Sequence, residues 1–138
     1  MTGPIPDVST IIGSGLLANR ERLSLIASNV ANADSITTPG GEPYRAREPV
    51  FKAEPVLQGS PAAGVSVAEV VESDAPPKLV YDPGNPYADD KGYVQQSNVD
   101  QVQQMTDLIS TTQSYKAQIA VLQQSTRLDQ AMLQSFID

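Results

Sequence analysis

The feature that most constrains this 138-residue chain is a pair of apolar stripes with helical spacing, one near each end. The first stripe advances in steps of four and three residues, as in the a/d seam of a coiled coil, and contains one asparagine. A helix with one apolar face needs a partner that covers it. The residues of this first stripe are Ile12, Leu16, Asn19, Leu23, Ile26 and Val30.

The second stripe lies in the last third of the chain and supplies a candidate partner for the first. No Pro or Gly interrupts residues 98–138, so we expect one helix of roughly 40 residues, about 60 Å long. Its opposite face is polar but weakly charged, which suits either hydrogen bonding between closely packed copies of the chain or simple exposure to water. The residues of this face are Gln103, Gln104, Asp107, Gln118, Gln124 and Gln130. The stripe consists of Val102, Met105, Ile109, Thr112, Tyr115, Ile119 and Leu122, continued by Leu128, Met132 and Phe136.

Capping residues and helix breakers predict where the two helices begin and end. Gly and Pro in residues 1–8 predict a short lead-in, after which Ser9 or Thr10 caps a helix that runs to about residue 32 or 33. The second helix is expected to start after Ser97 or Asn98. Within the first helix, a buried Asn19 would fix the register of a helix pair at some cost in stability, and a partly exposed asparagine is the simpler alternative.

Between the helices the pattern changes from helical to extended, and Pro, Gly and Asp mark the turns. Four short strands are expected at residues 44–52, 64–72, 78–81 and 92–95, together forming a small sheet. The predicted fold is therefore mainly α with a small β-rich middle. Residues 1–35 and 98–138 are expected to form a coiled-coil-like axial domain, and residues 36–97 a small outer domain of strands and loops.

Composition argues against catalysis and against nucleic acid binding. The chain has no His and no Cys, so the commonest general base and the usual metal ligands are missing. We expect no catalytic residues, no cofactor, no metal and no small-molecule substrate. Of the net charge of −7, residues 48–100 carry −6, with nine acids and three bases. No basic face exists to neutralise phosphates, and the nearly neutral ends suit close packing.

A cluster of acidic residues in the middle of the chain could be mistaken for a metal site or a catalytic site. Asp82, Asn85, Asp89 and Asp90 offer oxygen ligands but lack EF-hand spacing, so they predict an acidic turn. An enzyme acting on peptidoglycan would need a paired acid and base, and Asp89 and Asp90 are adjacent and exposed candidates for that alternative.

Arg45 and Arg47 fall on one face of a predicted strand. They are candidates for contacts with a carboxylate on a neighbouring subunit, and an ordinary charged surface is the alternative.

Membrane and targeting signals are also missing from the sequence. No stretch approaches the roughly 18 apolar residues of a membrane span, and the N-terminus shows no basic region followed by an apolar one. We expect no membrane insertion and no cleavable signal peptide.

Several motifs resemble those of bacterial flagellar rod and hook proteins. The segment IASNVANAD at residues 26–34 is similar to the motif that closes their N-terminal helix, with Ser28, Asn29, Ala31 and Asn32 as its core. GEPYR at 41–45, PKLVYDPGNP at 77–86, GYV at 92–94 and NV at 98–99 resemble, in this order, proteins of the proximal rod. Two departures are Val30 in place of a more usual leucine and the absence of a proline before Asn98.

This resemblance implies a structural subunit of the flagellar basal-body rod. Such a subunit is exported through the flagellar type III apparatus and polymerises in the periplasmic space, with terminal helices that become ordered on assembly. The implied partners are other copies of the chain, other rod proteins and the adaptor between the rod and the export gate. The alternative from the residues alone is a soluble helical adaptor or binding module whose two helices pair within one stable monomer.

Overall fold

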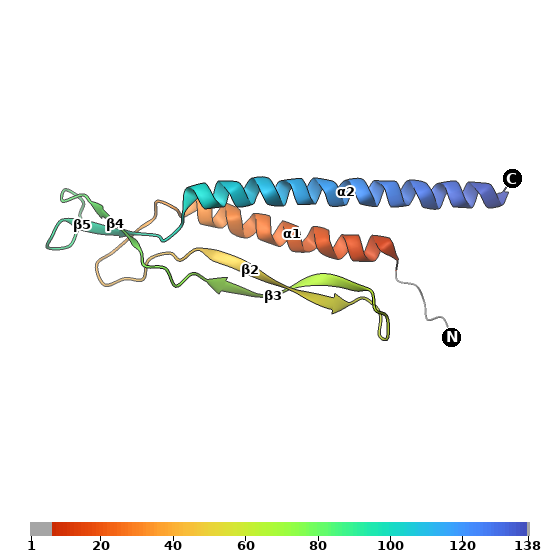
Figure 1. The fold of residues 1–138 in the computed structure, drawn as a ribbon. Coiled ribbons are helices and arrows are strands. Elements are labelled where there is room, and N and C mark those ends of the chain that lie inside the picture. Colours follow the sequence, from red (N-terminus) through yellow and green to blue (C-terminus); the bar gives the residue numbers. More distant parts are fainter. Residues whose placement is uncertain (1–6, 138) are drawn as a thin grey trace.

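The structure is a computed structural model that describes residues 7–137. Three layers lie side by side along an elongated molecule (Figure 1). Helix α2 (Gln101–Ile137) packs on helix α1 (Val8–Ala31), and a hairpin of β2 (Arg47–Pro55) and β3 (Ala63–Glu72) packs on the other side of α1. The prediction of two long helices around a β-rich middle is confirmed.

A second sheet lies at the end of the molecule where α1 finishes and α2 starts (Figure 1). It contains β1 (Ile36–Thr37), β4 (Lys78–Tyr81) and β5 (Tyr93–Gln96) in the order β1–β5–β4, and both pairings are antiparallel. The expected single sheet is therefore wrong, because β2 pairs only with β3. The two-residue β1 is too short to produce a periodic signal in the sequence.

Both helices begin at an aspartate, not at the residues predicted from the sequence. The Asp7 carboxylate accepts a hydrogen bond from the Ser9 backbone N–H at 3.1 Å and caps α1. The Asp100 carboxylate accepts from the first backbone N–H groups of α2 at 3.0 and 3.3 Å. Ser97 and Asn98 are wrong as caps because their side chains bind backbone groups elsewhere. Residues 1–6 of the predicted lead-in, and Asp138, lie outside the described residues.

One serine of α1 bonds directly to the hairpin strand β3. The Ser14 hydroxyl donates to the Ile11 carbonyl at 2.6 Å and accepts from the Val65 backbone N–H at 3.1 Å. A Cβ atom at Gly64 would lie 2.5 Å from the Ser14 Oγ, so only glycine allows this close approach. Helix α1 is thereby the central layer, held between α2 and the hairpin.

The buried core of the described residues is small and nearly half polar. At the junction of α1, β2 and α2, Ala33, Ala46 and Val99 pack together with Tyr44 against them. Many large apolar side chains on α2 remain exposed. The buried apolar residues are Ala18, Ile26, Ala33, Ala46, Val94 and Val99, and the buried polar ones are Asn19, Asn29, Ser97, Gln104 and Thr111.

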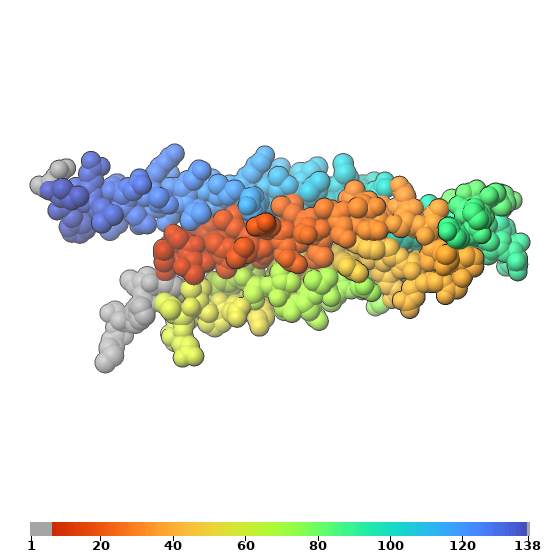
Figure 2. All heavy atoms as spheres, turned by 180° about the vertical axis from the view of Figure 1, so that it is seen from behind, coloured from red at the N-terminus to blue at the C-terminus, as the bar shows by residue number. Residues whose placement is uncertain are grey.

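Helix α2 is longer than its partner. It has 37 residues and α1 has 24, so at about 1.5 Å per residue they span roughly 55 and 36 Å. The C-terminal part of α2 projects beyond the start of α1, as both views show (Figures 1 and 2). Of the helices in residues 7–137, none is long and apolar enough to cross a membrane.

Candidate functional site: a polar helix seam and an exposed apolar stripe

One asparagine joins three segments of the chain. The Asn29 side chain, only 1% exposed, accepts hydrogen bonds from the Tyr44 hydroxyl at 3.0 Å and the Arg47 N–H at 2.9 Å. Its amide nitrogen donates to the Arg47 carbonyl at 2.9 Å and to the Gln104 Oε1 at 3.0 Å. The four bonds use both polar atoms of the amide fully. Asn29 therefore ties the end of α1 to the start of β2 and to the first turn of α2.

Other residues of the 26–34 motif determine how α1 ends. The Ser28 hydroxyl lies 3.0 Å from the Tyr44 hydroxyl. Asn32 is the C-cap residue, and its side chain donates to the Ser28 carbonyl at 2.9 Å. Ala31 is exposed, and no contact in the structure explains it.

A second asparagine, Asn98, holds the same β2 region from the other side. Its Oδ1 accepts from the Ala46 N–H at 2.7 Å, and its Nδ2 donates to the carbonyls of Ala75 at 2.9 Å and Ser73 at 3.2 Å. Beside it, the Ser97 hydroxyl donates to the Ala33 carbonyl at 2.7 Å. The segment that leads into β2 is thus fixed by side chains from both α1 and the approach to α2.

The contact between the two helices is polar. Far from Asn29, the Asn19 Nδ2 donates to the Gln118 Oε1 at 2.9 Å. Gln104 and Thr111 are 3% and 2% exposed, and the Thr111 hydroxyl has no hydrogen-bond partner among residues 7–137. We call these residues the polar seam: Asn19, Asn29, Gln104, Thr111 and Gln118. Gln104 and Gln118 belong to the polar face that was expected either to form hydrogen bonds between packed copies or to face water, and both pair with α1 of the same chain.

The first predicted stripe lies largely at the packed side of α1. Asn19 and Ile26 are buried, and Ile12, Leu16 and Leu23 are half-buried, whereas Val30 is 40% exposed. Asn19 is therefore buried, and the simpler alternative of a partly exposed asparagine is wrong. Its side chain is paired across the helix contact.

The second stripe does not face the first within the chain. Val102, Met105 and Ile109 are 76%, 55% and 59% exposed. At 3.6 residues per turn, Met105 lies about a third of a turn from the polar seam, and Val102 and Ile109 lie nearly half a turn from it. Along this half of α2 the two apolar stripes therefore do not pair within the chain, and their pairing between subunits stays a prediction. Farther along, Tyr115, Ile119 and Leu122 are half-buried, and the projecting end exposes Leu128, Met132 and Phe136.

Arg45 and Arg47 have carboxylate partners in the same chain. Arg45 lies 4.0 Å from Asp74, and Arg47 lies 3.6 Å from Glu72, its cross-strand partner in the hairpin. All four side chains are largely exposed, so each pair contributes little to stability. Contacts of Arg45 and Arg47 with a neighbouring subunit stay a prediction.

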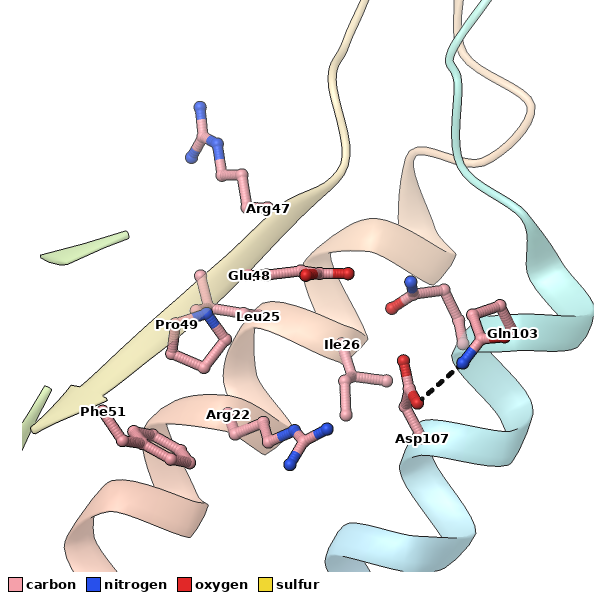
Figure 3. Close-up of a pocket in the computed structure, with 10 residues that line it drawn as sticks. Arg22, Leu25, Ile26, Arg47, Glu48, Pro49, Phe51, Gln103 and Asp107 are labelled. Atoms are coloured by element: carbon pink, nitrogen blue, oxygen red, sulfur yellow. Dashed lines mark hydrogen bonds between the residues drawn. The ribbon is translucent and has the colours of Figure 1, made fainter. Parts of the chain in front are cut away.

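A groove of about 260 Å³ lies between α1, β2 and the first turns of α2. Arg22 and Ile26 of α1, Phe51 of β2, and Gln103 and Asp107 of α2 contribute to its wall (Figure 3). Asp107 accepts a hydrogen bond from the Gln103 amide at 3.0 Å, and Arg47 points away from the groove (Figure 3). The wall mixes acidic, basic and apolar groups, and it contains no pair of titratable groups in contact that could transfer a proton.

The acidic turn is held by its own side chains. The Asp89 carboxylate accepts from the backbone N–H groups of Lys91 and Tyr93, both at 2.9 Å. Asn85 accepts from the Tyr87 N–H at 2.9 Å. Within residues 7–137, no three His, Cys, Asp or Glu residues form a group that could hold a metal. The turn is a structural one, as Asx-type hydrogen bonding predicts.

Comparison with known proteins decides which family carries this arrangement. The family model for the C-terminal region of flagellar basal body rod FlgEFG proteins matches residues 90–135. The flagellar basal-body rod proteins FlgC of Escherichia coli O6:H1 and Salmonella typhimurium are each 51% identical to the chain over 116 residues, which cover 84% of the chain and 86% of each relative. The chain belongs to the FlgC family of flagellar basal-body rod proteins.

A more distant FlgC, that of Aquifex aeolicus, is 39% identical over 109 residues, covering 79% of the chain and 80% of the relative. Membership of the FlgC family confirms the resemblance seen in the sequence and makes the chain a component of the flagellar rod, not an enzyme. It does not favour the alternative of a free-standing adaptor. The matched residues 90–135 include the polar seam of α2 and most of the second stripe.

The Asn29 contacts predict a large effect of Asn29→Ala. The substitution removes four hydrogen bonds and leaves the buried Gln104 amide oxygen without its partner. We expect the free energy of unfolding to fall by about 3 kcal/mol, measured by urea denaturation followed by circular dichroism. Gln113→Ala, at an exposed amide on α2, is the control and should change it little. Equal effects of the two substitutions would contradict the role given to Asn29.

Two glycines of α1 provide a matched test of the seam. A Cβ atom at Gly13 meets nothing within 4 Å, so Gly13→Ala should stabilise the helix by about 1 kcal/mol. A Cβ atom at Gly15 would lie 2.6 Å from the Gln118 Nε2 and would push that amide away from Asn19. We therefore expect Gly15→Ala to melt at a lower temperature than Gly13→Ala. Identical increases in melting temperature would show that the Asn19–Gln118 contact does not matter.

Proposed function

We propose that this chain is a structural subunit of the proximal rod of the flagellum. It polymerises through its two terminal helices, in a coiled-coil-like axial layer, into a helical tube that transmits torque and encloses the export channel. The observation that carries the proposal is the exposed stripe of Val102, Met105 and Ile109 on α2. An apolar helix face that the chain itself leaves uncovered needs a partner outside the chain.

The stripe is large enough to contribute substantially to assembly. Fully burying one such side chain stabilises a contact by about 2 kcal/mol, and the projecting end of α2 adds Met132 and Phe136. A contact that joins different surfaces of successive subunits does not close on itself and generates a helical tube. The first stripe contributes through Ile12, Leu16, Leu23 and Val30, which remain partly accessible.

Export is the second part of the proposal. The small, partly polar core supports a monomer of low stability, which can pass unfolded through the flagellar type III apparatus and fold again afterwards, with assembly adding the contacts that stabilise its terminal helices. Its partners are then other copies of the chain, other rod proteins and the adaptor between the rod and the export gate. Its place of assembly is the periplasmic part of the basal body.

Ile109→Glu tests whether the stripe serves assembly. Ile109 is exposed, so the variant should unfold at nearly the same urea concentration as the parent chain. In a flagellated host whose own FlgC gene is deleted, it should be synthesised but should not restore swimming, because a buried carboxylate in the subunit contact is costly. Swimming in soft agar and immunoblots of cell extracts measure the two effects.

Gln113→Glu is the matched control because it adds the same charge at another exposed position of α2. It should restore swimming to the level of the parent chain. Normal swimming with Ile109→Glu would remove this stripe from the proposed mechanism.

A further inference from the structure

Helix α2 turns a polar face to its own partner helix although it carries an apolar face. Gln104, Thr111 and Gln118 follow one another at intervals of seven residues, so they lie on one side of the helix. Gln104 and Thr111 are buried against α1, while Val102, Met105 and Ile109 are exposed. Along the first turns of α2, hydrophobic burial alone would favour the opposite orientation, whereas Tyr115, Ile119 and Leu122 farther along are half-buried in the present one. Apolar contact at the start of α2 therefore does not account for the rotation of the helix about its axis.

Two amide pairs supply that constraint. Asn29 donates to Gln104 at 3.0 Å, and Asn19 donates to Gln118 at 2.9 Å. The two acceptors lie fourteen residues apart on α2, which corresponds to about 21 Å along its axis. A helix held at two such points cannot turn without breaking both contacts. Gly15 helps, because it leaves the space that the Gln118 amide occupies.

The alternative orientation carries a definite cost. Turning α2 by roughly 150°, somewhat less than half a turn, would bring Val102, Met105 and Ile109 toward α1. It would also leave the buried Asn19 and Asn29 without their glutamine partners, and an unpaired buried amide is expensive. Single polar residues in helix seams are known to select register in this way.

We propose that the Asn29–Gln104 and Asn19–Gln118 pairs set the rotation of α2 and thereby keep Val102, Met105 and Ile109 outside the monomer. These four amides are positioning residues, and the orientation they select is a property of the isolated chain. The further statement that the stripe is kept free for a neighbouring subunit rests on the proposed function.

The chain contains no cysteine, so a single introduced thiol reports on one position. Met105→Cys places the probe on the exposed stripe and Thr111→Cys places it in the seam. In the parent chain the Met105→Cys thiol should react with a maleimide at least about tenfold faster, because a buried thiol reacts only when the helix opens. Each probe is then combined with Gln104→Ala and Gln118→Ala, which remove both acceptors without lowering helix propensity.

Rotation predicts that the two reaction rates reverse in the double alanine variant, with Met105→Cys protected and Thr111→Cys reactive. Gln113→Ala with Gln124→Ala, at two exposed amides of the same helix, should leave the parent order unchanged. An unchanged order in the Gln104→Ala, Gln118→Ala variant would overturn the proposal. Fast reaction of both probes with helical content retained would also overturn it, because the helices would then separate without turning.

A single-site comparison covers the case in which the double variant does not fold. Gln118→Glu keeps an acceptor oxygen for Asn19, whereas Gln118→Ala removes it. Only Gln118→Ala should raise the reactivity of Thr111→Cys relative to Met105→Cys, and equal behaviour of the two variants would contradict the inference. Because these measurements use the isolated chain, they are independent of swimming. The orientation can therefore hold even if Ile109→Glu shows that the stripe has no role in assembly.

Discussion

The arrangement of this chain depends on the buried side-chain amide of Asn29. Among the described side chains, only Asn29 lies at the end of α1 and forms hydrogen bonds both to the entry to β2 and to the start of α2. A buried amide is stable only when its polar atoms are paired, and here they are paired with backbone and side chains from distant parts of the sequence. Because burying this amide without partners would be costly, the segments that carry its partners must lie in one fixed arrangement around it. Asn98 adds a second fixed point on the same segment.

The same principle extends along the helices. A contact between α1 and α2 made by apolar residues alone would be stronger, but it would tolerate rotation and sliding. The polar seam gives up some of that strength and specifies one orientation. Because the exposed stripe of α2 remains outside this contact, its apolar side chains are free for the intermolecular burial that we propose. On that proposal, a weak monomer and a stronger assembly follow from the same set of residues.

The sequence predicted the helices well and their contact poorly. The apolar spacing and the long run without Pro or Gly are local signals, and they were sufficient to place α1 and α2. Periodicity shows which face of α2 needs burial but not which partner covers it, so the sequence left open whether the two stripes pair within one chain or between chains. Nothing in the sequence around Gln104 and Gln118 shows whether these side chains lie in the helix contact or face water. Their partners lie 75 and 99 residues away in the chain, and the role of Asn29 depends on contacts 15, 18 and 75 residues away.

A density map of the assembled rod, at a resolution that shows side chains, tests the central claim most directly. The account predicts that Val102, Met105 and Ile109 contact apolar side chains of a neighbouring subunit within about 4.5 Å. It also predicts that the Asn29–Gln104 pair remains intact in every copy of the chain. A map in which these three residues face water, or in which they pack against α1 of their own subunit, would contradict the account.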